Sequence, residues 1–195
     1  MRFLRNLTLL VVLGLSSLSV MAQGSGVDIQ KMLETRDLEI KNVVGPKGTE
    51  YTEAQKESLK TMINDVIDFE AMSRTALEDT YNEITPEQRT EFVDLFSTVI
   101  KENSLLKLEI YRASVTYNEV DINGNNAVVK TMAELDDVRT PVDYKMELRG
   151  DDWKITDMSI DDVYTAESYR RQFQRIINRR GFDGLMDSLR KRVAR

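Results

Sequence analysis

The feature that most constrains this chain is a change in the spacing of its apolar residues. Between residues 27 and 111, apolar side chains recur every three or four positions, as on one face of a helix. After residue 113 the period becomes two, and the clearest strand places four apolar side chains on one face: Val142, Tyr144, Met146 and Leu148. The helical period returns near Thr165. This order predicts an α+β fold in which helices pack on a curved antiparallel sheet.

The strand region divides into about four segments. We expect strands over residues 115–120, 127–135, 142–148 and 153–160. The Asn123-Gly124-Asn125-Asn126 sequence is typical of a hairpin turn, and Gly150-Asp151-Asp152 predicts a second turn. The strands therefore predict an antiparallel meander with one apolar face that is buried against the helices.

Helix boundaries are marked by capping residues. A helix over 27–41 is interrupted by Gly45-Pro46-Lys47-Gly48, and Thr52 caps a second helix. A third helix is expected over 69–77. Thr85-Pro86-Glu87-Gln88 is a capping box with Pro at the first helical position, and the helix that it starts is expected to continue, bent, to Tyr111. Gly181 ends the helix that begins near 165, and a last helix follows it.

The first 22 residues form a separate segment. Arg2 and Arg5 precede an uncharged, mostly apolar run over 7–20, and Val20-Met21-Ala22 has small or apolar residues at the positions that a signal peptidase reads. A membrane anchor is the alternative, but 14 residues rise only about 21 Å as a helix, against a hydrocarbon core of about 30 Å. We therefore expect a signal peptide at 1–22, export of the mature protein, and one domain over 23–195.

The residue alphabet restricts the chemistry. The chain has 195 residues with no Cys and no His, which excludes disulfides and thiolate nucleophiles and removes the usual zinc ligands. No phosphate-binding loop or nucleophile elbow is present. Asp136-Asp137 and Asp161-Asp162 are adjacent carboxylate pairs. Because neighbouring residues on a strand point to opposite faces, neither pair is expected to bind a single ion. We expect no enzyme activity, no cofactor and no metal site.

Charge is distributed unevenly. Residues 169–195 carry nine basic and two acidic residues, a net charge of +7, whereas residues 23–168 carry 16 basic and 31 acidic residues, a net charge of −15. The basic end is either a docking surface for an acidic partner or anionic lipid, or a pair of helices with solvated arginines. Binding of nucleic acid is not expected for an exported, acidic protein.

The apolar faces are broad for a chain of this size. The apolar face of the sheet and the aromatic faces of the helices either close into a solid core or leave a slot between them, and periodicity does not separate these outcomes. The candidate slot residues are Phe92, Phe96, Ile100, Met132, Tyr144, Met146, Leu148, Met158, Ile160, Tyr169, Phe173 and Ile177.

Two groups of segments carry a resemblance to a known family. The first is Asp68-Phe69-Glu70-Ala71-Met72-Ser73 through Leu77, followed by residues 85–92; the second is Pro141-Val142, residues 153–158, Ser168-Tyr169-Arg170-Arg171-Gln172-Phe173 and residues 181–189. Together they resemble the MlaC family of periplasmic phospholipid-binding proteins, over about residues 27–193.

The resemblance implies a fold related to the nuclear transport factor cone, with extra helices and an elongated cavity for acyl chains. It also implies a non-enzymatic carrier that passes phospholipid between an outer-membrane lipoprotein complex and an inner-membrane ABC transporter with MCE domains. In that setting Arg170, Arg171 and Arg175 are candidates for partner docking.

Two positions depart from the family pattern. Many relatives have Gly after the leucine of the first signature, where this chain has Glu78, and relatives tend to have Gly where this chain has Asp162. Glycine adopts backbone conformations that these acids tolerate less well.

Two other functions remain open from the sequence. One is a protein-interaction module with a solid interior that docks through its basic C-terminal helices. The other is a small cone-fold enzyme for an apolar substrate, in which Tyr144 and an acid act on the substrate.

Overall fold

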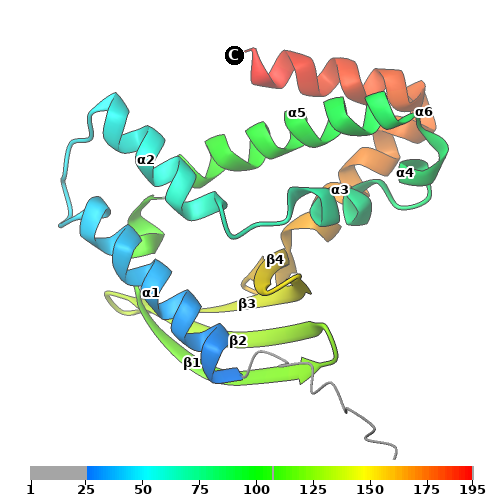
Figure 1. Ribbon diagram of the computed structural model, residues 1–195. Helices are drawn as coiled ribbons and strands as arrows, with labels where there is room; N and C mark the ends of the chain where they lie inside the picture. Colours follow the sequence, from blue (N-terminus) through cyan, green and yellow to red (C-terminus); the bar gives the residue numbers. More distant parts are fainter. Residues whose placement is uncertain (1–25, 107, 195) are drawn as a thin grey trace, which may run out of the picture.

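The structure is a computed structural model that describes residues 26–106 and 108–194, so the expected signal peptide lies outside the described residues. Figure 1 shows a curved sheet with one helix across it and a separate group of helices beyond its end. In chain order the elements are α1 (Gly26–Val44), α2 (Glu53–Asn64), α3 (Phe69–Leu77), α4 (Thr80–Glu83), α5 (Pro86–Leu105), the 3₁₀ helix η1 (Leu108–Arg112), β1 (Ser114–Asn123), β2 (Asn126–Leu135), β3 (Val138–Arg149), β4 (Asp152–Ile160), β5 (Val163–Tyr164) and α6 (Thr165–Val193). Among the described residues, no helix has both the length and the apolar character needed to cross a membrane.

The sheet confirms the predicted α+β fold. Its strands are antiparallel and pair in chain order, β1-β2-β3-β4-β5. The sequence predicted about four strands, and the structure adds the two-residue β5, which pairs with the end of β4. Such a short strand lacks the alternating pattern that would identify it.

A bulge in the β3–β4 pair decides which side chains of β4 face α1. The register shifts between Lys145 and Met146. On one side of the shift Tyr144 pairs with Met158, and on the other side Met146 pairs with Ile155. Directly paired residues share a face, so Met158 joins the face of Tyr144. Asp157, buried on the opposite face, accepts a hydrogen bond from the backbone N–H of Ala166 at the start of α6.

The expected continuation of α5 to Tyr111 is wrong. The helix ends at Leu105, where the Ser104 hydroxyl donates to the Lys101 carbonyl and so competes with the helical backbone pattern. The chain then forms η1, whose Arg112 donates to the carbonyls of Val44, Gly45 and Pro46. The break therefore fastens η1 to the end of α1.

The helices α3, α5 and α6 share an aromatic core. Phe92 and Phe96 are fully buried, and Phe173 packs edge-on against both at centroid distances of 5.7 and 5.4 Å. Gly181 interrupts α6 with φ 69° and ψ 176°, a conformation that favours glycine, and so accounts for the predicted end of that helix. The second half of α6 returns Leu185 to the same core.

The two departures from the family pattern lie at unusual backbone positions. Glu78 ends α3 with φ 50° and ψ −129°, and Asp162 has φ 60°. Glycine adopts both conformations without a steric cost, whereas a residue with a Cβ is strained at Glu78. The Glu78 carboxylate binds Arg170 of α6 at 2.5 Å, so the side chain at this turn links α3 to α6.

Candidate functional site

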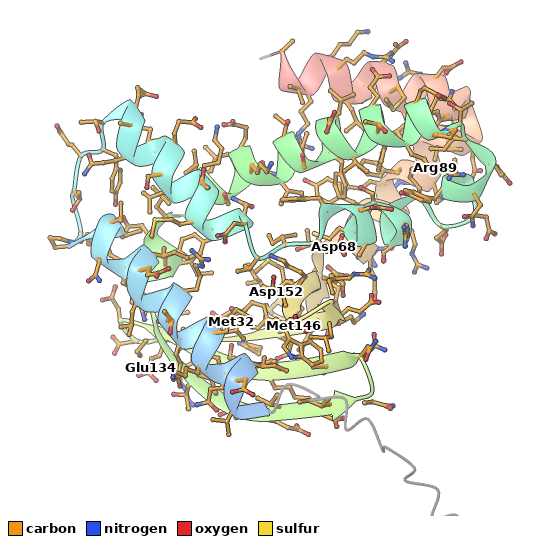
Figure 2. All side chains as sticks on the ribbon, in the orientation of Figure 1. Met32, Asp68, Arg89, Glu134, Met146 and Asp152 are labelled. Carbon is orange, nitrogen blue, oxygen red and sulfur yellow. The ribbon has the colours of Figure 1, made fainter. Side chains whose placement is uncertain are left out.

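A cavity of about 130 Å³ lies between α1, the end of α2, the end of α5, η1 and the sheet. Met32 of α1 and Met146 of β3 lie in the space between helix and sheet beside it (Figure 2). The wall of the cavity is mainly apolar: Leu33, Ile40, Ile63, Val66, Ile67, Ile100, Val115, Ile155 and Met158.

Three tyrosines provide polar groups in this apolar wall. Tyr111 comes from η1, Tyr117 from β1 and Tyr144 from β3. None of their hydroxyls has a hydrogen-bond partner in the part of the chain that the structure describes. The η1 turn and the strands β1 and β3 therefore bring to one cavity three tyrosines that are far apart in the sequence.

These phenols stay protonated over a wide pH range. Burial raises the pKa of Tyr111 to about 12. Burial also raises the pKa of Tyr117 and of Tyr144, and the nearby Asp37 carboxylate adds to both shifts. Each phenol can therefore donate a hydrogen bond into the cavity at neutral pH.

The charged residues that line the cavity are already paired. Arg36 binds Glu39 at 3.1 Å and Asp65 at 2.7 Å, and Asp37 binds Lys41 at 2.6 Å. The Arg36–Asp65 pair also ties α1 to the residue that follows α2. Each pair reduces the local net charge at its edge of the cavity.

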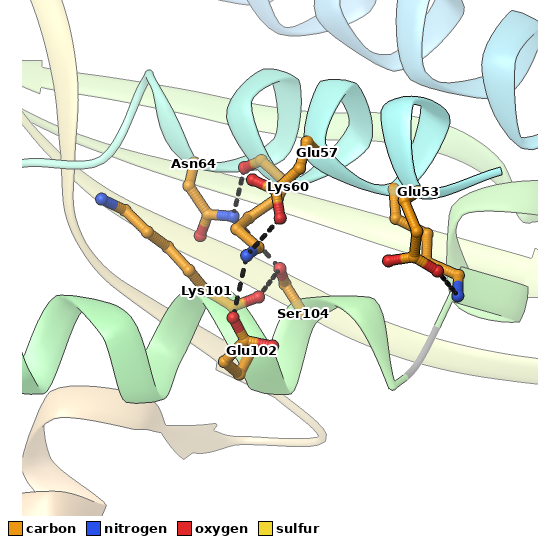
Figure 3. Close-up of polar contacts among 8 residues, drawn as sticks. Glu53, Glu57, Lys60, Asn64, Lys101, Glu102 and Ser104 are labelled. Atoms are coloured by element: carbon orange, nitrogen blue, oxygen red, sulfur yellow. Dashed lines mark hydrogen bonds and ion pairs between the residues drawn. The ribbon is translucent and has the colours of Figure 1, made fainter. Parts of the chain in front are cut away.

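Polar contacts hold α2 against α5 beside the cavity (Figure 3). Lys60 binds both Glu57 and Glu102 at 2.8 Å, and the Asn64 amide donates to the Ser104 hydroxyl at 3.1 Å. The buried amide oxygen of Asn64 has no partner. Asn64 and Ser104 line the cavity, so this contact fixes the wall where the two helices meet.

Of the twelve candidate slot residues, the structure places Ile100, Tyr144 and Met158 on the cavity wall. Met146 and Leu148 pack in the adjoining core between α1 and the sheet.

The other candidates lie elsewhere. Five of them pack in the aromatic core of α3, α5 and α6: Phe92, Phe96, Tyr169, Phe173 and Ile177. Ile160 pairs with Val142 beyond the cavity, and Met132 lies on the opposite face of β2 from the buried Val129 and Thr131. Aromatic helix faces fill one another here instead of lining a slot.

The sequence prediction missed most of the wall. Leu33 and Ile40 belong to the apolar stripe of α1, and Ile63 belongs to that of α2, so their burial could be predicted from the sequence. The sequence could not predict that they face a common cavity, because this depends on how α1 crosses the sheet. The signals for Tyr111 and Tyr117 were weaker, since one follows a helix end and the other precedes a bulge.

The three docking candidates differ in their surroundings. Arg170 is held by Glu78, as described above. Arg171 and Arg175 are exposed, and neither has an ion pair within the described chain. With Arg179 and Arg180, which are also exposed and unpaired among the described residues, they form what we call the arginine ridge, defined as Arg171, Arg175, Arg179 and Arg180.

Comparison with protein families supports the resemblance noted in the sequence. The MlaC protein family matches residues 39–191, most of the described chain. The chain belongs to the MlaC family. The matched segment contains most of the cavity wall, from Ile40 to Met158, and all of the arginine ridge. A comparison with curated protein sequences found no match.

A solved structure shows the same fold as this MlaC family member. The phospholipid-binding protein from Ralstonia solanacearum, in complex with a phospholipid, superposes with a TM-score of 0.70 at 21% sequence identity. The alignment covers 85% of this chain and 94% of the other. At this identity the likeness establishes the fold.

Proposed function

We propose that this protein is a periplasmic phospholipid carrier that holds its ligand by the acyl chains in the cavity between α1, α2, α5 and the sheet. The observation that carries the proposal is the apolar cavity, whose wall comes from the four helices α1, α2, α5 and η1 and from the three strands β1, β3 and β4. Family membership and the phospholipid complex of the similar R. solanacearum protein support it.

Apolar burial provides the binding energy for such a carrier. Each buried methylene contributes about 0.8 kcal/mol, so two long acyl chains offset much of the cost of leaving a bilayer. The proposed role needs no catalytic group and no cofactor, because differences in affinity between donor, carrier and acceptor drive the transfer.

The size of the cavity adds a requirement. Its volume of about 130 Å³ is close to the roughly 150 Å³ that accepts benzene, and small-molecule sites usually span about 300–1,000 Å³. Acyl chains therefore enter only when a wall moves. The Arg36–Asp65 pair and the contacts of Arg112 with residues 44–46 join α1, α2 and η1. The Lys60–Glu102 and Asn64–Ser104 contacts join α2 to α5, so this helical wall would move away from the sheet as one unit.

Lipid capture from vesicles tests the proposal. The purified protein is mixed with vesicles of phosphatidylethanolamine and phosphatidylglycerol and separated by gel filtration, and its bound lipid is extracted and identified by mass spectrometry. We expect about one phospholipid per protein. Protein that remains empty at every vesicle concentration would refute the proposal.

Ile100→Trp tests whether the lipid binds in this cavity. The larger side chain would occupy the cavity, and we expect at least tenfold less captured lipid. Thr98→Trp is the matched control, because it adds the same side chain to α5 at a residue that does not line the cavity. Equal loss in both variants would place the lipid elsewhere.

We further propose that the arginine ridge docks the carrier on its membrane partners, an inner-membrane ABC transporter with MCE domains and an outer-membrane lipoprotein complex. Four exposed cations on one helix of an otherwise acidic protein favour an acidic partner surface. Such a contact weakens with salt, because the Debye length falls from about 10 Å at 0.1 M to about 3 Å at 1 M.

Charge reversal tests the docking surface. Arg171→Glu with Arg175→Glu should weaken binding to a purified MCE domain at least tenfold at low salt, and the difference should shrink at high salt. Lys31→Glu with Lys47→Glu, at two exposed cations outside α6, is the control. Unchanged binding of the arginine variant would exclude the ridge.

A further inference from the structure

The three unpartnered tyrosines need an account that apolar binding does not provide. A slot that only sheltered hydrocarbon would be served equally well by phenylalanine. Yet η1, β1 and β3 each contribute a tyrosine to the same cavity, and none of the three hydroxyls has a partner among the described residues. The three tyrosines are partly buried and line the cavity. A ligand that fills the cavity and displaces water must supply acceptors to their hydroxyls, because a hydroxyl left without a hydrogen bond costs free energy.

The surroundings of the phenols select the kind of acceptor. Although Lys41 binds Asp37 at 2.6 Å, the Asp37 charge still adds to the raised pKa of Tyr117 and Tyr144. It would likewise disfavour an added anion. Of the described residues that line the cavity, Arg36 is the one cation, and two carboxylates already bind it. A phosphate or a free carboxylate is therefore a poor occupant of this position.

A neutral carbonyl oxygen meets these conditions. In a diacyl phospholipid, two ester carbonyls lie where the hydrocarbon chains begin, next to groups that need an apolar wall. The cavity provides both parts at once, with three phenolic donors among aliphatic side chains such as Ile100 and Val115.

We propose that Tyr111, Tyr117 and Tyr144 donate hydrogen bonds to the acyl-ester carbonyls of the bound lipid, so that the carrier prefers ester-linked lipids to ether-linked ones. The inference rests on the proposed lipid-carrier function and adds a chemical selectivity to it. The hydroxyls distinguish an ester from an ether linkage by hydrogen bonding, while the aliphatic wall contacts the acyl chains.

Paired lipids that differ only in their linkage test the inference. Vesicles contain equal amounts of diacyl and dialkyl phosphatidylglycerol with chains of the same length, and mass spectrometry measures the ratio of the two lipids captured by the wild-type protein. A net hydrogen bond corresponds to about twofold to tenfold in affinity. We therefore expect the diacyl lipid to be favoured by at least about threefold.

Removing the hydroxyls should remove the preference. In Tyr117→Phe with Tyr144→Phe, the capture ratio should approach one while the dialkyl lipid is still taken up. Tyr169→Phe is the matched control, because its hydroxyl accepts a hydrogen bond from Asn103 in the helical core and the ratio should stay at the wild-type value.

The outcomes separate the two proposals. Equal capture of the two lipids by the wild-type protein would overturn the ester preference and leave the carrier function intact. A preference that survives in the double variant would show that the phenols do not read the linkage. Capture of neither lipid would overturn the carrier function together with this inference.

Discussion

The helical group and the α1–sheet layer are both apolar, but they use their apolar surface differently. In the helical group, Phe96 is fully buried and contacts Tyr169 and Phe173 at centroid distances of 5.0 and 5.4 Å. In the α1–sheet layer, aliphatic side chains and three tyrosines surround about 130 Å³ of unfilled space. One region is a core built for stability, and the other is a core that stops short of closing.

The contrast has a physical basis. Flat aromatic rings on α5 and α6 can tilt until they fill the space between the two helices, as the edge-on pairs of Phe173 show. Helix α1 crosses a curved sheet. Its N-terminal part packs on the sheet through Ile29, whereas the part from Leu33 to Ile40 borders the cavity. Tyrosines extend into this space, but their hydroxyls then lack partners.

The largest expected effect comes from Phe96→Ala. Truncating a fully buried ring should reduce the free energy of unfolding by about 3–5 kcal/mol. Ile100→Ala, on the same helix but at the cavity wall, should cost no more than about half as much, because that side chain already borders empty space. Urea denaturation measures both values, and equal losses would contradict the distinction between the two regions.

Alkaline pH should weaken the α1–sheet layer next. The folded pKa of Tyr111 is about 12, whereas its ordinary value is 10. Above pH 10 the unfolded chain releases this proton while the folded chain retains it, so stability is intact below about pH 10 and is lost as the pH rises toward 12. Tyr111→Phe should recover about 2 kcal/mol of this loss at pH 12.

Stability curves at pH 8 and pH 12 measure that difference. Tyr164→Phe, the same change outside the cavity, is the control. If both variants respond alike to pH, burial of Tyr111 does not set the alkaline limit.

A smaller gain is expected at the strained turn after α3. Glu78→Gly should stabilise the helical group by about 1 kcal/mol, because it relieves the backbone strain at this turn. This gain in free energy exceeds two losses, that of the exposed ion pair with Arg170 and that due to the greater conformational entropy of glycine in the unfolded chain. Glu78→Ala removes the same carboxylate but keeps a Cβ, so it should be neutral or slightly destabilising. Thermal unfolding distinguishes them, and equal behaviour would exclude strain at this turn.

The smallest effect concerns Asp157, at the boundary between the two regions. Burial raises its pKa, although hydrogen bonds from the backbone N–H groups of Ala166 and Met158 act in the opposite direction. A raised folded pKa means that the protonated native state is favoured, so this group lowers stability as the pH rises above its ordinary value of 3.8.

Asp157→Asn stays uncharged and keeps an oxygen acceptor. Its stability relative to the wild type should therefore increase between pH 4 and pH 7, as measured by urea denaturation. Asp151→Asn, in an exposed turn, should show no such trend. A flat difference for Asp157→Asn would mean that the carboxyl does not resist ionisation.

Much of the fold was predictable because its signals are local. The capping box at Thr85 and the third helix over 69–77 appear at the predicted residues, and the Gly124 turn joins β1 to β2. The end of α5 was not predictable in this way, because the helical pattern continues past Leu105 while contacts of Arg112 with the end of α1 favour η1.

By itself, the sequence determined which side chains are apolar, which face of each element they occupy, and that helices must cover an antiparallel sheet. Only the tertiary structure decided that the faces of Phe92 and Phe173 close on each other, while those of Leu33 and Tyr144 leave a cavity. The reason is that a cavity is the volume left between opposing surfaces. That volume depends on how α1 crosses the sheet and where the bulges lie, and no local pattern of residues encodes either.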